Sequence, residues 1–398
     1  MNGWGRTGLC AGVALLLGAA PAPDYRSDAL ALTRTIADHY AYLDRFPDRQ
    51  VPASSLLDAE AAAVSDRKGL IRHAERRLAT LADHHAITGQ SLADSRALVP
   101  SRTDLWIVRR PHGYLIEAVR ASSAAARADV RAGDMLIAID GAPIAHAVHD
   151  YWRELGLANT IGRAEHAARV LAAGRRDRDR KLTVARPGGA TRTLSLANLY
   201  GPTPDRPPVT REGATIRTND ALGDDATIAA FDAAMSAIPA DAPLTIDLTD
   251  TPSGGNTRIA RAILGWFVDQ ATPYQQHSVR AEGGIARGWL ELVYPRPLKR
   301  HRGRVTVRVG RWTASMGEGL AIGFAAIGAR VEGTRMAGLL GAVDDIVLPA
   351  SGLTLRLPHE QLWTVDNQPR ESFAPQGSDG QRGAIRIAPS RRTSSPLK

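Results

Sequence analysis

The stretch VTVRVGRWTASMGEG, residues 305–319, decides the fold of this chain. Its first five residues alternate valine with polar side chains, which is the period-two pattern of a β-strand. The residues after Gly319 are mostly apolar and predict a buried helix that ends at Gly328. Ser315 therefore lies at a turn between a strand and a helix. At such a turn a hydroxyl lies beside unpaired backbone N–H groups and the positive end of a helix dipole.

Ser315 has two interpretations at this turn. A nucleophile for acyl transfer needs donors nearby that hold an oxyanion, and the start of a helix supplies them. Serine is also a common helix N-cap, which is a purely structural role. The GxSxG pattern of many serine hydrolases is absent, because Thr313 occupies the position of its first glycine. The choice between nucleophile and cap depends on the rest of the chain.

Composition limits the classes of partner. The 398 residues are enough for two or three domains, and 44% of them are hydrophobic, as in ordinary globular proteins. The net charge of +9 would permit nucleic-acid binding. The arginines are scattered, however, and the basic clusters at residues 175–181 and after Arg382 are typical of solvated loops and tails. No nucleic-acid-binding motif accompanies them, so we expect no nucleic-acid partner.

The first 22 residues have the pattern of a secretory signal peptide. One arginine precedes an apolar run and then small residues, which predicts cleavage near Ala20 or Ala22. The run is too short for a transmembrane helix, and no later run is long enough to span a membrane. Cys10, the only cysteine, lies inside this segment, so the mature chain would have no disulfide, catalytic cysteine or cysteine zinc ligand. We expect an exported protein, periplasmic or secreted.

Three regions follow the signal peptide. Residues 24–97 have helical periodicity. Residues 104–198 combine short strands with a helical insertion, and a proline-rich linker follows at 201–208. Strands alternate with helices over residues 209–376, which predicts an α/β domain. The tail, residues 377–398, is rich in Gly, Ser and Arg and is predicted to be disordered.

The region 104–198 resembles a PDZ domain. The pattern GYLIEAV precedes an alanine-rich segment and then AGDMLIAIDGAPI at residues 132–144, in which Asp140 and Gly141 form a turn signal. PDZ domains bind an extended peptide, often a C-terminus, by adding it to a sheet edge. The resemblance implies a peptide partner.

Three further motifs contain candidate site residues. DLTDTPSGGNT, residues 247–257, predicts a strand that enters adjacent glycines, whose N–H groups suit an oxyanion hole or a plain turn. LADHH ends in His84 and His85, which suit a base or a structural role; the HExxH metal motif is absent. NQPRESFAP contains Glu371, a candidate carboxylate or an exposed loop residue.

Together these motifs resemble one family, the C-terminal processing peptidases, and specifically its tricorn-core-like branch. The resemblance covers residues 24–375. TASMGE resembles the family's TASAGE, which assigns the nucleophile to Ser315. LADHH resembles LGDGH, which assigns the histidine to His85. PRESFAP resembles the late EGxGIxPD stretch, which assigns the orienting carboxylate to Glu371.

The same resemblance implies the fold and the oxyanion donors. It predicts a crotonase-like (ClpP/crotonase-type) α/β catalytic domain, preceded by the helical region and the PDZ-like domain. DLTDTPSGG resembles DLRxNxGGG, so Gly254 and Gly255 match two of its glycines. Backbone N–H groups of Met316 and of one of these glycines would hold the oxyanion. No metal or organic cofactor is implied.

The chain departs from the family where the catalytic lysine of a Ser–Lys dyad is expected. Leu339 and Leu340 occupy that segment, which leaves the Ser–His–Glu arrangement of the tricorn-like branch. His84 replaces a glycine beside the histidine and has no assigned role. Glu318 is a rival carboxylate, to which we assign a structural role.

The sequence therefore predicts an exported serine endopeptidase that cleaves extended or C-terminal protein segments. An inactive peptide- or ligand-binding protein on the same scaffold is the alternative. A polyanion-binding protein is a third possibility, and it would require a contiguous basic face.

Overall fold

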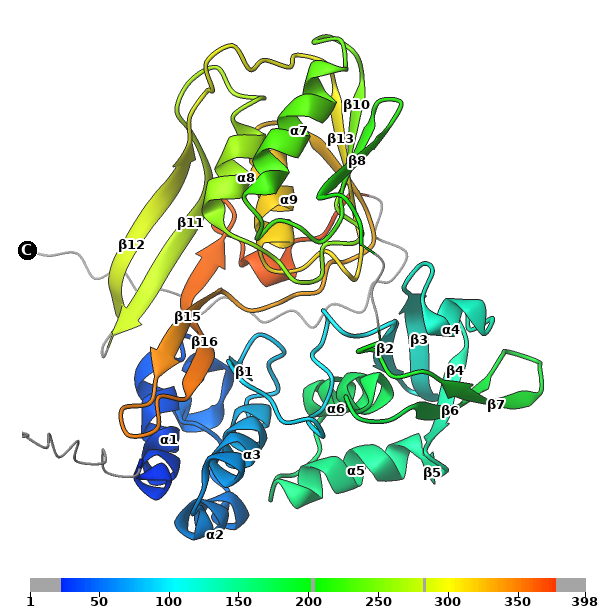
Figure 1. Ribbon diagram of the computed structural model, residues 1–398, viewed down its shortest axis with the longest axis vertical. Coiled ribbons are helices and arrows are strands. Elements are labelled where there is room, and N and C mark those ends of the chain that lie inside the picture. Colours follow the sequence, from blue (N-terminus) through cyan, green and yellow to red (C-terminus); the bar gives the residue numbers. More distant parts are fainter. Residues whose placement is uncertain (1–22, 202–204, 282–283, 377–398) are drawn as a thin grey trace, which may run out of the picture.

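The computed structural model describes residues 23–201, 205–281 and 284–376, and Figure 1 shows their arrangement. The predicted signal peptide and C-terminal tail lie outside the described residues. Within them, no helix combines the length and the apolar character needed to cross a bilayer. The three regions occupy three parts of the molecule: α1–α3 at the lower left of Figure 1, the central unit (residues 105–196) at the lower right, and the C-terminal unit above them.

The N-terminal region consists of helices with side-chain caps. The helices are α1 (Tyr25–His39), α2 (Ser55–Ala63) and α3 (Arg67–Ala79). Asp24, Ser54 and Asp66 precede them, and each accepts a backbone N–H of the first turn. After α3 the chain runs through residues 80–99 mainly as turns and irregular structure, with the short strand β1 (Ile87–Thr88). His84 and His85 lie between the last turn of α3 and β1.

The central unit is an antiparallel sheet with helices against it. Its strand order is β2-β3-β4-β6-β7, with β5 paired to β4. The strands are β2 (Leu105–Arg110), β3 (Gly113–Val119), β4 (Met135–Ile139), β5 (Ala142–Pro143), β6 (Arg180–Ala185) and β7 (Thr191–Leu196). The helices are α4 (Ala124–Arg127), α5 (Ile144–Glu154) and α6 (Ile161–Ala173). Asp140 and Gly141 have positive φ, as expected for the turn between β4 and β5.

The C-terminal unit contains a sheet of order β14-β13-β10-β9-β8. All its pairs are parallel except β8 with β9. The strands are β8 (Val209–Glu212), β9 (Thr215–Thr218), β10 (Leu244–Asp247), β13 (Val305–Val309) and β14 (Arg330–Gly333). The helices are α7 (Ala226–Ser236), α8 (Thr257–Leu264) and α9 (Met316–Ala326). Ile246, Val307, Leu320 and Phe324 are buried in one core, which fixes α9 beside the sheet.

A second sheet joins the C-terminal unit to the N-terminal helices. Its order is β1-β16-β11-β12, with β15 also paired to β16. The strands are β11 (Thr272–Ala281), β12 (Gly284–Val293), β15 (Ala342–Val347) and β16 (Thr354–Trp363). Both β1 and β15 pair with β16 around Arg356. This pairing brings the segment before β1, which carries His85, to the segment before β15, which carries Leu340.

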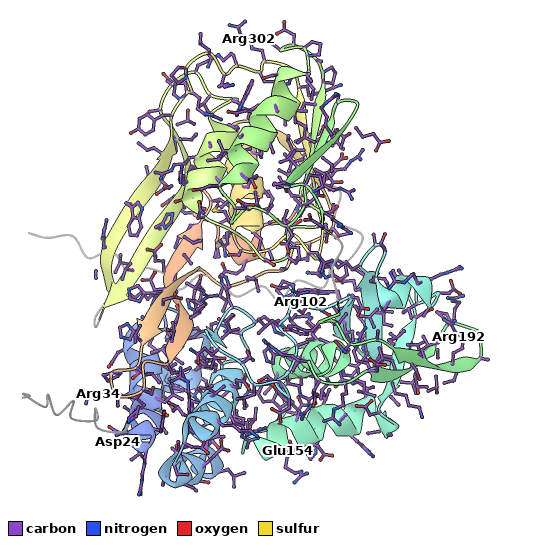
Figure 2. The ribbon with its side chains drawn as sticks, in the orientation of Figure 1. Asp24, Arg34, Arg102, Glu154, Arg192 and Arg302 are labelled. Carbon is purple, nitrogen blue, oxygen red and sulfur yellow. The ribbon has the colours of Figure 1, made fainter. Side chains whose placement is uncertain are left out.

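The predicted α/β class is confirmed by this mixture of parallel and antiparallel sheets with helices. Charged side chains are spread over the surface, and Figure 2 shows Arg34, Arg192 and Arg302 at three separate extremities.

Candidate active site

Ser315 lies at a sharp turn between β13 and α9, as predicted. Its backbone has φ 52° and ψ −113°. An ordinary N-cap residue lies in the β region, and a positive φ costs a residue with a side chain about 1–3 kcal/mol. Capping alone does not require this conformation. A strained strand-to-helix turn is the geometry that exposes a nucleophilic hydroxyl.

Contacts on the β13 side hold the turn. Thr251 lies parallel to Thr313 in an isolated bridge, and its N–H donates to the Trp312 carbonyl over 2.9 Å. The Thr313 hydroxyl donates to the Leu248 carbonyl over 2.7 Å. The turn that carries Ser315 is therefore fastened to the chain that leaves β10.

Glu318 fastens the turn from the other side. Its side chain is fully buried and accepts the N–H of Ser315 over 2.9 Å, of Gly338 over 2.8 Å and of Leu339 over 3.2 Å. Burial raises the pKa of Glu318 to about 7, although these donors oppose the shift. The carboxyl group thus connects the nucleophile turn to residues 338–339, in agreement with the structural role assigned from the sequence.

Arg370 binds the backbone carbonyl groups of the same segment. Arg370 is 2% exposed, and its guanidinium donates to the carbonyls of Ser315 (3.3 Å), Leu339 (2.9 Å) and Gly341 (2.8 Å). The sequence analysis did not identify Arg370. Residues 338–341 and the Ser315 turn therefore form one hydrogen-bonded body.

His85 is attached to this body through its ring. Its Nδ1 lies 2.7 Å from the Leu340 carbonyl oxygen. A carbonyl only accepts, so Nδ1 carries the proton and the Nε2 lone pair is available as a base. Burial lowers the pKa of His85 to about 4. The imidazole is therefore neutral at neutral pH.

A polar cluster fixes the backbone at His85. The carboxylate of Asp83 accepts the His85 N–H over 2.9 Å and the Tyr40 hydroxyl over 2.9 Å. Arg45 in turn donates to the Tyr40 oxygen over 2.8 Å. Burial raises the pKa of Asp83 above its ordinary value. The irregular segment after α3 is thus anchored directly before the candidate base.

Glu371 lies near this polar cluster, close enough to Arg45 and Asp83 for their charges to act on it. Among the described residues, no hydrogen bond or ion pair joins the side chains of Glu371 and His85, and Glu371 Oε2 is buried without a hydrogen-bond partner. Burial raises the pKa of Glu371, while Arg370 and Arg45 lower it. The group that contacts Nδ1 is the Leu340 carbonyl, and a backbone group of this kind carries no signal in the sequence.

The two predicted glycines have different surroundings. Gly254 has φ 73°, and a Cβ built on it would lie 2.5 Å from Ser315 Cβ, 2.8 Å from Ser315 Oγ and 3.3 Å from the Met316 nitrogen. A Cβ on Gly255 would instead overlap the Leu222 carbonyl oxygen. Gly254 therefore packs against the hydroxyl, whereas Gly255 packs against the neighbouring loop. Within the described chain, the N–H groups of Met316 and Gly254 have no acceptor.

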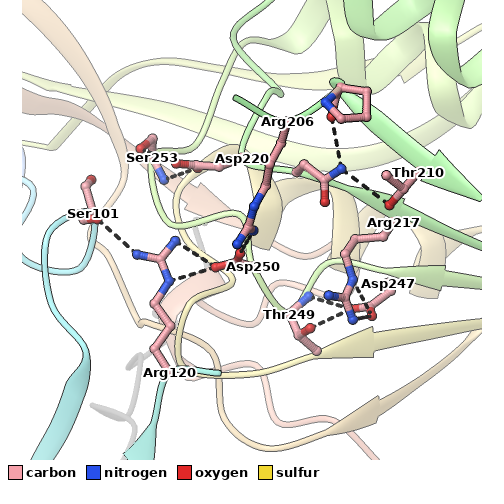
Figure 3. Close-up of polar contacts among 12 residues, drawn as sticks. Ser101, Arg120, Arg206, Thr210, Arg217, Asp220, Asp247, Thr249, Asp250 and Ser253 are labelled. Atoms are coloured by element: carbon pink, nitrogen blue, oxygen red, sulfur yellow. Dashed lines mark hydrogen bonds and ion pairs between the residues drawn. The ribbon is translucent and has the colours of Figure 1, made fainter. Parts of the chain in front are cut away.

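The loop before these glycines is held from two sides, as Figure 3 shows. Arg120, at the end of β3, donates to Asp250 over 2.8 Å, and Arg206 donates to the same carboxylate over 3.0 Å. Ser253 is bonded to Asp220 through its N–H (2.7 Å) and its hydroxyl (2.8 Å). Arg120 belongs to the central unit, so that unit directly supports the loop that contacts Ser315. The sequence analysis missed these contacts because they join residues far apart in the chain.

The described residues contain no cluster of three or more His, Cys, Asp or Glu side chains placed to hold a metal ion. The arrangement consists of a hydroxyl, a neutral imidazole and unpaired backbone donors, which together suit acyl transfer.

The fold that carries this site is that of the C-terminal processing proteases. The photosystem II D1 C-terminal processing protease superposes with a TM-score of 0.52 and 15% identity, covering 89% of this chain and 92% of that chain. Mature CPAF in complex with lactacystin superposes with a TM-score of 0.59 and 15% identity, covering 88% of this chain and 92% of that chain. No family model and no curated protein matches the sequence. The resemblance drawn from the motifs is confirmed at the level of the fold, and the activity has to be argued from the site.

Proposed function

We propose that this protein is a serine peptidase in which Ser315 is the nucleophile and His85 is the general base. The observation that carries the proposal is the strained turn at Ser315, against which Gly254 packs with an unpaired N–H. His85 is attached to the same hydrogen-bonded segment by its Nδ1, which leaves Nε2 as the acceptor. A helix-capping role for Ser315 explains neither the strained turn nor the attachment of His85 to the same segment.

The proposed reaction proceeds by acyl transfer. His85 Nε2 takes the proton of the Ser315 hydroxyl while the oxygen attacks the scissile carbonyl carbon. The N–H groups of Met316 and Gly254 hold the oxyanion that forms. The imidazolium then gives its proton to the leaving amine, and a water molecule hydrolyses the acyl-enzyme by the same steps. The low pKa of His85 keeps the base unprotonated at neutral pH, and the Leu340 carbonyl stabilises the protonated ring.

Glu371 is proposed to stabilise the charged imidazole by its field rather than by direct contact. Its unpartnered Oε2 and its place beside Arg45 and Asp83 support this role. Glu371→Gln removes the charge and retains the shape, so kcat should fall by about 10-fold or more, while KM should change little. Steady-state kinetics on a peptide measure this change. An unaltered kcat would remove Glu371 from the mechanism.

We propose that the central unit is PDZ-like and the C-terminal unit crotonase-like, and that the substrate is an extended protein or peptide segment. The edge strand β2 is already engaged within the chain. The Arg109 N–H donates to Glu165 over 2.9 Å, and the Ile107 carbonyl accepts from Arg169 over 2.9 Å. A peptide added to this edge would have to displace these two side chains of α6.

We also propose export, supported by the composition of residues 1–22. N-terminal sequencing of the secreted protein should begin between Pro21 and Tyr25. An intact Met1 on protein in the cytoplasmic fraction would contradict export.

A serine-directed fluorophosphonate probe tests the proposed nucleophile. The wild-type chain should be labelled, and Ser315→Ala should abolish labelling. Ser236→Ala, at an exposed serine on α7, is the matched control and should label normally. An unlabelled wild-type chain would favour the inactive binding scaffold.

A further inference from the structure

A cavity of about 350 Å³ lies behind the segment that carries the candidate base. Residues of α3, of the irregular chain from Asp83 to Val99 and of helices α5 and α6 line it. In Figure 1 these elements meet in the lower half of the molecule, between the N-terminal helices and the central unit. Neither Ser315 nor Gly254 lines the cavity. It is therefore a site separate from the candidate active site, although His84, one of its lining residues, adjoins His85.

Part of the wall is aromatic, and two of its ring nitrogens, His84 Nε2 and His166 Nδ1, are buried without a hydrogen-bond partner among the described residues. The rings of His84 and His166 stack with their centroids 4.3 Å apart and their planes 15° apart. Burial lowers the pKa of His166 to about 3 and lowers the pKa of His84 well below its ordinary value. Both imidazoles are therefore neutral. Leu155 and Val99 extend this wall, which suits an apolar group.

The acidic side chains of the wall are mostly occupied. Asp94 pairs with Arg72 over 3.0 Å and with Arg175 over 3.1 Å. Glu75 accepts the Ser95 hydroxyl over 2.6 Å. Asp83 is engaged at His85 and Tyr40, as described above. The two arginines offset the charge of Asp94, whereas Glu75 and Asp83 accept hydrogen bonds from neutral donors.

Arg96 differs from the other described arginines of the wall, which are ion-paired. Across the described part of the chain, its side chain has neither a hydrogen bond nor an ion pair. The side chain is exposed to solvent at the cavity, and partial desolvation lowers the pKa of Arg96 while Tyr151 and Glu154 oppose this shift. Glu154, exposed at the end of α5 (Figure 2), lies beyond ion-pair distance. A guanidinium in this situation favours a carboxylate, which it binds with two parallel hydrogen bonds.

We propose that this cavity binds a carboxylic acid that carries an apolar group. The carboxylate pairs with Arg96, and the apolar group packs against the stacked imidazoles. The volume is sufficient, because a cavity of about 150 Å³ already accepts benzene. The acid is either the C-terminal residue of a peptide or a small free acid. The inference goes beyond the proposed function, because binding here does not require Ser315 to react.

Calorimetric titration of the full chain carrying Ser315→Ala tests this site without hydrolysis. N-acetyl-leucine should bind with a Kd of about 1 mM or lower, and N-acetyl-leucinamide, which lacks the charge, at least about 10-fold more weakly. Arg96→Gln should weaken binding of the acid about 10-fold or more. Arg34→Gln, on the exposed face of α1, should leave it unchanged. Equal affinity for acid and amide, or full affinity in Arg96→Gln, would overturn the proposal.

Ala79→Leu supplies a second variant that retains the charge of Arg96. Ala79 lines the cavity on α3, so a larger apolar side chain there should fill space and weaken N-acetyl-leucine binding. Unchanged binding in this variant would place the acid elsewhere and contradict the proposal. The tripeptide N-acetyl-Ala-Ala-Leu distinguishes the two sources. Binding at least as tight as that of N-acetyl-leucine supports a chain terminus, whereas loss of binding supports a small free acid in the same site.

Discussion

Replacing Gly254 by alanine tests whether glycine is required here because it adjoins Ser315 or only because its φ is positive. The left-handed φ of 73° alone costs alanine about 1–2 kcal/mol. The added Cβ would also lie 2.5 Å from Ser315 Cβ, where apolar atoms prefer about 3.5–4.0 Å. Overpacking of this kind costs about 1–3 kcal/mol. The total is about 2–5 kcal/mol, provided that the loop keeps its position.

Gly213 is the matched control. It has φ 56°, and a Cβ built there meets nothing within 4 Å. Gly213→Ala should therefore lose only the left-handed strain, about 1–2 kcal/mol. The difference between the two variants isolates the overlap with Ser315.

The overlap should appear in catalysis as well as in stability. Ion pairs at Asp250 and hydrogen bonds at Ser253 hold the loop, so Gly254→Ala can relieve the overlap only by displacing Ser315 or the oxyanion donor. A shift of about 1 Å, or the loss of one donor, lowers kcat by roughly 100-fold. Urea unfolding gives the stability, and steady-state kinetics give kcat. If Gly254→Ala matched Gly213→Ala in both, Gly254 would not adjoin the nucleophile as described.

Three further outcomes are expected. The logarithm of kcat/KM on a peptide should rise with pH and level off above a midpoint of about 4, the pKa of His85. The reason is that only the neutral imidazole accepts a proton. A midpoint near 6.5 would contradict the described burial of His85. Burial raises the pKa of Glu318 from 4.5 to about 7, so the stability contributed by its protonated form is complete below pH 4.5 and is lost as the pH rises past 7. Urea unfolding between pH 5 and 8 should therefore show the free energy of unfolding fall by about 3 kcal/mol at most. The Glu318→Gln variant should lack this pH dependence. Ser315→Gly should be about 1 kcal/mol more stable than Ser315→Ala, because glycine adopts φ 52° without strain; equal thermal and urea midpoints would show that the turn is relaxed.

The sequence predicted the elements whose signals are local. The alternating valines of β13, the serine turn and the apolar α9 follow one another in 22 residues, from Val305 to Ala326, so periodicity was sufficient to place Ser315. The DG turn after β4 was also local. Gly254 was assigned correctly to a loop, but its contact with Ser315 was implied only by the family resemblance.

Long-range pairing accounts for what the sequence did not reveal. The hairpin β11–β12 and the pairing of β16 with both β1 and β15 depend on partners up to about 270 residues apart, and no local pattern encodes them. The segment in which a dyad lysine was expected illustrates the consequence. Leu340 has no catalytic side chain, yet its carbonyl is the group that contacts His85 Nδ1. A backbone contribution of this kind is invisible to residue-type reasoning.

The central claim is that Ser315, His85 and the donors at Met316 and Gly254 form one catalytic unit. A crystal structure of the fluorophosphonate-treated protein tests it most directly. We predict phosphorus bonded to Ser315 Oγ, a phosphoryl oxygen about 2.7–3.1 Å from the nitrogens of Met316 and Gly254, and His85 Nε2 within about 3.2 Å of Oγ. An adduct on another residue, or one on Ser315 with the imidazole and both donors out of reach, would contradict the account.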